Sequence, residues 1–163
     1  MGYGLTMSPQ SESASFEARD PEFASRVSES FERQLIMATI GGELQSVEPG
    51  IVRITLPFRE GLTQQHGFLH AGVVTTIVDS ACGYAALSLS EPNTGVLTVE
   101  YKVSLLAPAR GEHFVAVGRV IKSGRSMCFT EGEVWGVVGD EEVLVARMTA
   151  TIMNVAGRGE ITG

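Results

Sequence analysis

The sequence predicts an α+β fold in which an antiparallel β-sheet wraps a long, buried central helix, with one extra helix on the N-terminal side. Two observations predict it. Residues 71–89 are apolar nearly all round at helical length. The chain after them reads as a succession of alternating strands separated by turns. A sheet of this kind must bury one face, and wrapping it around the apolar helix satisfies both elements.

The N-terminal side is expected to contribute a flexible tail and one helix. Residues 1–20 are rich in Ser, Gly and Glu and are assigned to the tail. Asp20-Pro21-Glu22 is typical of a helix start, with Asp as N-cap and Pro at the first helical position. Apolar residues then recur about every four positions and predict an amphipathic helix ending at Gly41-Gly42. These residues are Phe23, Val27, Phe31, Leu35 and Ala38.

Six strands are expected around the central helix. Residues 43–48 and 51–58 precede it, joined by Pro49-Gly50. Residues 97–105, 113–121, 127–138 and 143–155 follow it as a meander. In the first of these, odd-numbered apolar residues are predicted on one face and Thr98, Glu100, Lys102 and Ser104 on the other. The sequence thus predicts a single domain over residues 21–155 and a loose tail over 156–163.

Composition restricts the function. A length of 163 residues suits one domain with a sizeable core. The net charge of −7 argues against a nucleic-acid partner, which requires a basic face. The apolar stretch 71–89 contains Asp79 and several Thr, Ser and Gly residues and has no basic flanks, so we do not assign it to a membrane. Without a secretory leader pattern and with only two cysteines, we expect a cytoplasmic protein.

Asp79 is the charged residue inside the predicted buried helix. Removing a lone carboxylate from water costs several kcal/mol unless the group is paired or hydrogen-bonded. A carboxylate satisfied by nearby hydroxyls and a catalytic carboxylate are about equally compatible with the sequence.

His70, Ala71 and Gly72 stand where a polar loop becomes this helix. Backbone N–H groups at a helix start lack internal partners and can hold a developing oxyanion. The alternative is that His70 only caps the helix. His70 and Asp79 lie nine residues apart, on roughly opposite faces and about 13 Å apart along the axis. If both serve catalysis, the site is expected to be shared between two subunits.

The segment from His70 to Ala81 resembles the His-Gly-Gly…Asp motif of PaaI-type hotdog thioesterases, relatives of the 4-hydroxybenzoyl-CoA thioesterases. The resemblance covers about residues 40–155. It implies that Asp79 is the nucleophile or the general base and that the Ala71 amide polarises the thioester carbonyl. It also implies that His70 orients the loop, and that Gln64 and Thr98 help to position water or substrate. Ala71 departs from the family's usual Gly, and its methyl group is expected to narrow the substrate channel.

The resemblance also implies partners and a place for coenzyme A. The turn containing Lys122, Gly124, Arg125 and Ser126 resembles the family turn near the coenzyme A tail, although an ordinary solvated hairpin turn explains these residues equally simply. We expect an acyl-CoA substrate, aryl or medium-chain, no other cofactor and no metal site, and a homodimer that pairs into a dimer of dimers. Two alternatives stay open: a hotdog dehydratase acting on 3-hydroxyacyl thioesters, and an acyl-CoA binding module without catalysis.

Overall fold

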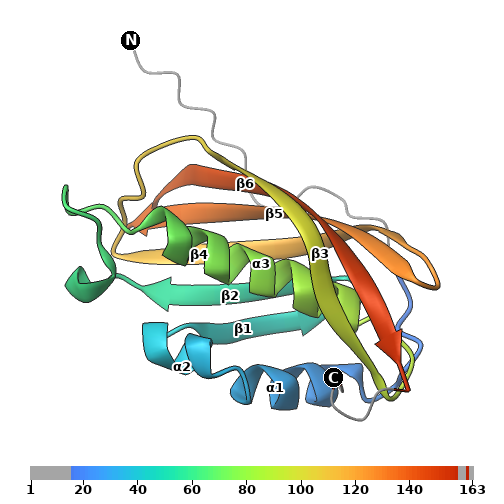
Figure 1. Cartoon of the computed structure of the whole chain (residues 1–163). Coiled ribbons are helices and arrows are strands. Elements are labelled where there is room, and N and C mark those ends of the chain that lie inside the picture. Colours follow the sequence, from blue (N-terminus) through green and yellow to red (C-terminus); the bar gives the residue numbers. More distant parts are fainter. Residues whose placement is uncertain (1–15, 158–160, 162–163) are drawn as a thin grey trace.

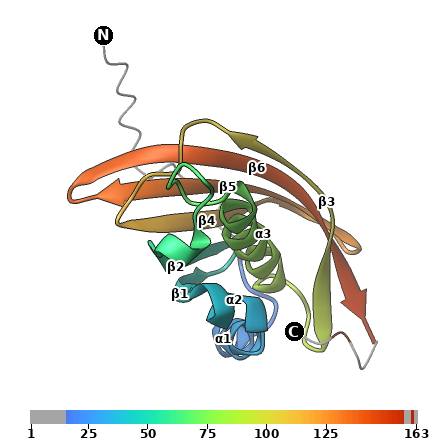
Figure 2. The ribbon, with the colours of Figure 1, turned by 60° about the vertical axis from the view of Figure 1, so that its left-hand side comes forward.

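The structure is a computed structural model that describes residues 16–157 and 161. Its sheet has six strands in the order β1-β2-β4-β5-β6-β3, and all neighbouring pairs are antiparallel. The elements are α1 (Phe23–Glu32), α2 (Leu35–Ile40), β1 (Glu43–Glu48), β2 (Ile51–Pro57), the 3-10 turn η1 (Glu60–Leu62), α3 (Ala71–Leu87), β3 (Thr94–Leu105), β4 (His113–Ser123), β5 (Met127–Val138) and β6 (Glu141–Ala156). The sheet curves around α3 (Figures 1 and 2), so the predicted α+β hotdog arrangement is confirmed.

The central helix packs directly on the backbone of the sheet. Ten residues of α3 are buried, as its apolar sequence predicts. Gly118 of β4 permits the closest approach, because a Cβ there would lie 2.3 Å from the carbonyl carbon of Ala81. Gly132 of β5 likewise permits a close approach, because a Cβ there would collide with the side chains of Val78 and Cys82. These contacts fix the rotation of α3 about its axis, and therefore which of its residues point away from the sheet.

The N-terminal helix differs from the prediction in its start and its continuity. α1 begins at Phe23, and the Asp20 carboxylate accepts a 2.9 Å hydrogen bond from the Glu22 amide. The chain then leaves helical geometry at Gln34 (φ −80°, ψ 88°), and α2 begins anew at Leu35. This break resets the helical phase, so Met37 is buried whereas Leu35 is 78% exposed. The predicted single helix is therefore two helices.

The two predicted tails are only partly described. Residues 1–15, 158–160 and 162–163 lie outside the described residues. Residues 16–20, which the sequence assigns to the tail, belong to the packed structure. Phe16 packs against the core, and Asp20 is buried in an ion pair of 2.9 Å with Arg26.

Strand β3 forms one edge of the sheet and contains a bulge. Thr98 pairs with Ile152 and Glu100 with Thr151, which are consecutive residues of β6, so Thr98 and Glu100 face opposite sides of the sheet. The prediction that both share a face is wrong because of the extra residue, Val99. The strand also keeps several apolar side chains exposed, namely Leu97, Val99, Tyr101 and Leu105.

Within residues 16–157, none of the helices combines the length and the apolar character needed to cross a bilayer.

Candidate active site

Asp79 lies in the middle of α3 on the side that faces β3. Its carboxylate Oδ1 accepts a 2.9 Å hydrogen bond from the Thr98 hydroxyl. Partial burial raises the pKa of Asp79 above its usual value, and the hydrogen bond from Thr98 opposes this shift. The side chain is half-buried in the chain alone. The sequence expectation of a carboxylate on a buried helix therefore holds only in part, because this face of α3 borders a pocket.

The pocket beside Asp79 has a volume of about 160 Å³. Asp79, Ser80 and Gly83 of α3 line it from one side and Thr98 of β3 from another. The segment where α1 ends and α2 begins also borders the pocket, through Ser30 of α1 and Gln34 at the break. Ser80 Oγ donates a 3.2 Å hydrogen bond to Gln34 Oε1, and this bond connects the break between α1 and α2 to the central helix.

The first turn of α3 contains one backbone amide without a partner among the described residues. His70 is the N-cap, and its ring Nδ1 accepts a 2.9 Å hydrogen bond from the Gly72 amide. The amides of Val73 and Val74 donate to the His70 carbonyl at 2.9 and 3.1 Å. Among the hydrogen bonds of residues 16–157, none uses the Ala71 amide, and Ala71 is exposed. The backbone amide of Ala71, and not that of Gly72, is therefore available to donate a hydrogen bond to a ligand.

The loop that precedes α3 is held in place by local hydrogen bonds and by one from the segment before β4. The amide of His70 donates to the Leu62 carbonyl at 2.9 Å, and that of Leu69 to the Ala109 carbonyl at 3.1 Å. Gln64 Oε1 accepts from the His66 amide within the loop. Gln64 also lines a second pocket, of about 150 Å³, together with Phe68 and Ala71. Gln64 and Ala71 therefore border the same pocket.

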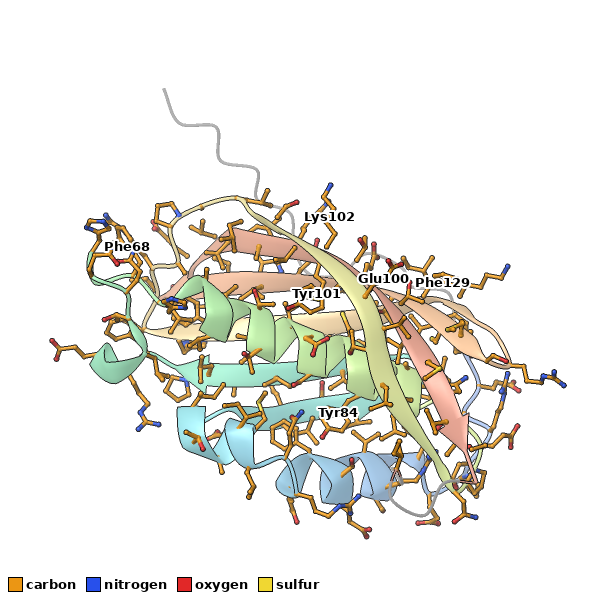
Figure 3. The ribbon with its side chains drawn as sticks, viewed as in Figure 1. Phe68, Tyr84, Glu100, Tyr101, Lys102 and Phe129 are labelled. Carbon is orange, nitrogen blue, oxygen red and sulfur yellow. The ribbon has the colours of Figure 1, made fainter. Side chains whose placement is uncertain are left out.

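The predicted residues thus form two groups on one helix. His70, Ala71, Gly72 and Gln64 cluster at the start of α3, whereas Asp79 and Thr98 lie beside its middle. Ala71 and Asp79 are eight residues apart, which is about 12 Å of helix. Figure 3 labels Phe68 in the loop before α3 and Tyr84 in the second half of α3. One thioester carbonyl cannot reach both groups within a single chain.

The turn after β4 is ordered by a residue that the sequence analysis did not single out. Asn154 Nδ2 donates to the carbonyls of Gly124 and Arg125 at 3.1 and 3.2 Å. The Gly124 amide donates to the Met127 carbonyl at 2.9 Å, so this amide is occupied. Lys122 and Arg125 remain exposed.

Sequence reasoning also missed Ser30, Gln34 and Tyr84 as residues near Asp79. Ser30 and Gln34 come from the N-terminal helices, and their approach depends on the break at Gln34, which helical periodicity does not reveal. Cys82, three residues after Asp79, is buried in the core, and burial raises the pKa of its thiol to about 12. Within residues 16–157, no three His, Cys, Asp or Glu side chains are grouped to hold a metal ion.

Comparisons with known proteins agree with this architecture. The thioesterase superfamily model matches residues 66–143. A candidate esterase of Saccharolobus solfataricus is 37% identical over 103 residues, covering 63% of this chain and 68% of that protein. Human acyl-coenzyme A thioesterase 13 is 30% identical over 125 residues, covering 76% of this chain and 86% of that protein. The crystal structure of a thioesterase family protein from Silicibacter pomeroyi is 47% identical, with a TM-score of 0.82, and covers 83% of this chain and 99% of that one.

Proposed function

Because this chain belongs to the thioesterase superfamily, we propose that it hydrolyses an acyl-CoA thioester to a free acid and coenzyme A. One observation carries the proposal: α3 presents both a partly desolvated carboxylate, Asp79, and a backbone amide, that of Ala71, with no partner among residues 16–157. Thioester hydrolysis needs these two groups, one to deliver the nucleophile and one to stabilise the charge on the carbonyl oxygen.

Asp79 supplies the nucleophile in one of two ways. Its carboxylate attacks the thioester carbonyl, expels the thiolate and leaves a mixed anhydride that water then cleaves. Alternatively, it takes a proton from a water molecule whose oxygen attacks the carbonyl directly; the tetrahedral intermediate then collapses by breaking the C–S bond and expelling the coenzyme A thiolate. The hydrogen bond from Thr98 favours the ionised form of Asp79 against the effect of burial and orients one of its oxygens in either route.

The Ala71 amide holds the oxyanion. It points out of the helix start, where the partial positive charge of the helix dipole adds to the donor. His70 supports it indirectly, because the bond to the Gly72 amide fixes the first turn of α3. The methyl group of Ala71 leaves this N–H in place, so replacement of the family's Gly preserves the donor.

The two groups meet across a subunit interface. They are about 12 Å apart in one chain, and reacting atoms must lie within about 3 Å of both. The exposed apolar residues of edge strand β3 suit pairing with a second copy of this strand. A two-fold axis there places Asp79 and Thr98 of each subunit near the helix start of the other. The functional unit is therefore a homodimer, and such dimers pair further into a dimer of dimers.

The turn after β4 binds the phosphates of coenzyme A. Lys122 at the end of β4 and Arg125 within the turn are exposed, and the bonds from Asn154 hold the turn backbone in one conformation. Arginine and lysine are the side chains that recognise phosphate most strongly, and a pre-ordered turn lowers the entropic cost of binding.

The test is release of free thiol across a panel of acetyl-, hexanoyl-, decanoyl- and phenylacetyl-CoA, with wild type beside Asp79→Ala. Release that requires Asp79 supports the proposal. If crotonyl-CoA is hydrated instead and no thiol appears, the chain is a dehydratase. Tight acyl-CoA binding with neither reaction means a binding module. Either outcome refutes hydrolysis.

A further inference from the structure

We propose that Arg26 is a positioning residue for the hydrolysis: it holds the end of α3 and the start of β3 together, and so keeps Thr98 at hydrogen-bond distance from Asp79. This inference rests on the proposed function, because it names a residue that acts on the same site from a distance. Arg26 lies in α1, which precedes residues 66–143, the part of the chain that the superfamily model matches.

The guanidinium of Arg26 binds backbone carbonyls along the segment that leads from α3 to β3. Its Nη2 donates to the carbonyls of Leu87 and Ser90 at 3.4 and 2.9 Å. Its Nη1 donates to the carbonyls of Glu91 and Thr94 at 3.3 and 3.2 Å, and to Ser90 Oγ at 3.0 Å. Leu87 is the last residue of α3, and Thr94 is the first residue of β3. One side chain therefore bonds both ends of this connection.

The guanidinium is itself held in place from α1. The side chain of Arg26 is only 12% exposed, and Asp20 Oδ2 lies 2.9 Å from its Nε in an ion pair. The other carboxylate oxygen of Asp20 accepts a hydrogen bond from the Glu22 amide just before α1. Arginine suits this place because its planar fork presents five N–H donors in a fixed geometry, whereas a lysine ammonium is a point charge with three. We therefore expect lysine to be a poor substitute at position 26.

The position of β3 relative to α3 depends on direct contacts of this kind. Within the chain, β3 is an edge strand and is paired on one side only, with β6. The central helix is fixed separately, because it packs closely on β4 and β5 at Gly118 and Gly132. Contacts between the helix and the edge strand therefore decide how precisely a side chain of β3 faces a side chain of α3.

The Asp79–Thr98 pair is sensitive to small movements at the Arg26 contacts. Leu87 follows Asp79 by eight residues, about 12 Å of helix, and Thr98 follows Thr94 by four residues, about 13 Å of strand. The Thr98 hydroxyl lies 2.9 Å from Asp79 Oδ1, so a shift of about 0.7 Å between strand and helix is enough to lose this hydrogen bond. Burial and the Thr98 bond are the causes of the shifted pKa of Asp79, so Arg26 acts through Thr98.

The first experiment measures kcat and KM for hexanoyl-CoA in wild type, Arg26→Lys and Val52→Ala. Val52 is a buried residue of β2, on the other side of the sheet from β3, and its truncation controls for lost stability. At a temperature where all three are folded, we expect Arg26→Lys to lower kcat by between about threefold and tenfold, with KM within about twofold of wild type. If Arg26→Lys does not fold, Asp20→Asn removes the ion pair and is compared in the same way. A kcat equal to that of Val52→Ala overturns the inference.

The second experiment asks whether Arg26 acts through Thr98. Arg26→Lys is combined with Thr98→Val, and the two single variants are measured beside the double variant. Because Thr98→Val already lacks the hydrogen bond, we expect Arg26→Lys to lower kcat little further in that background. The acid limb of the pH–rate profile should move to higher pH in both single variants. Equal losses of kcat from Arg26→Lys in both backgrounds overturn the inference. A failure of the proposed function looks different, because wild type then releases no thiol from any acyl-CoA.

Discussion

Removal of the Thr98 hydroxyl tests the electrostatics of the site without touching the carboxylate. Thr98→Val keeps the shape of the side chain and deletes the 2.9 Å hydrogen bond to Asp79 Oδ1. A hydrogen bond to a charged group contributes about 1.5–3 kcal/mol, and we take the lower end because Thr98 is exposed in the chain alone. About 1.5 kcal/mol corresponds to roughly a tenfold loss of kcat/KM at neutral pH.

The same variant shifts the pH dependence in a definite direction. The Thr98 bond lowers the pKa of Asp79 against the raising effect of burial. Without that bond the pKa rises further, so a smaller fraction of Asp79 is ionised at any given acidic pH. The acid limb of the pH–rate profile is therefore expected to move to higher pH.

The assay is thiol release between pH 4 and 8 for wild type, Thr98→Val and Thr98→Ser. Serine keeps the hydroxyl and should restore most of the rate and the original acid limb. The reasoning is refuted if Thr98→Val retains the wild-type profile, or if Thr98→Ser is as impaired as Thr98→Val.

Three further predictions follow from single contacts. Gly118→Ala places a Cβ 2.3 Å from the backbone of Ala81 and should cost about 3 kcal/mol, which lowers Tm by roughly 6–12 °C; an unchanged melting curve would contradict the packing. Asp79→Asn should raise Tm at neutral pH and lose this advantage in acid. The pKa of Asp79 in the wild-type protein is raised, so Asp79 contributes stability when protonated, and this stability is lost as the pH rises through the folded-state pKa. The opposite trend would exclude desolvation as the cause. Arg125→Ala should raise KM for acyl-CoA severalfold in low salt and leave KM for the matching acyl-pantetheine unchanged; equal effects on both would remove Arg125 from phosphate binding.

The central helix and the strands could be predicted because their patterns are local. The stretch from Ala71 is apolar on all sides, and no position other than the centre of the fold can bury such a helix. The strands after it alternate or are bounded by turn residues, and their observed limits differ from the prediction by at most three residues. His70 at a loop-to-helix boundary likewise predicted an N-cap, which the bond from the Gly72 amide confirms.

The break at Gln34 and the bulge at Val99 could not be predicted, because each depends on tertiary contacts. Phe23 to Ala38 has the spacing of one continuous helix, yet Met37 and Ile40 are buried instead of Leu35 and Ala38. The alternation from Leu97 to Leu105 continues in the sequence through a position where the pairing with β6 slips by one residue. Both irregularities border the pocket beside Asp79, through Gln34 and Thr98. The part of the site that the sequence missed is therefore the part shaped by these two features.

The most direct test of the shared site mixes two inactive variants. Asp79→Asn removes the carboxylate. Ala71→Pro removes the amide donor at the first helical position, where proline is accepted and where the extended His70 (ψ 137°) suits a following proline. Each homodimer alone should be inactive. After co-refolding in equal amounts, half of the dimers are mixed and each contains one intact site, so thiol release should return to about a quarter of the wild-type rate. If size-exclusion and mass analysis show mixed dimers but no activity returns, the carboxylate and the amide act within one chain and the proposed site is wrong.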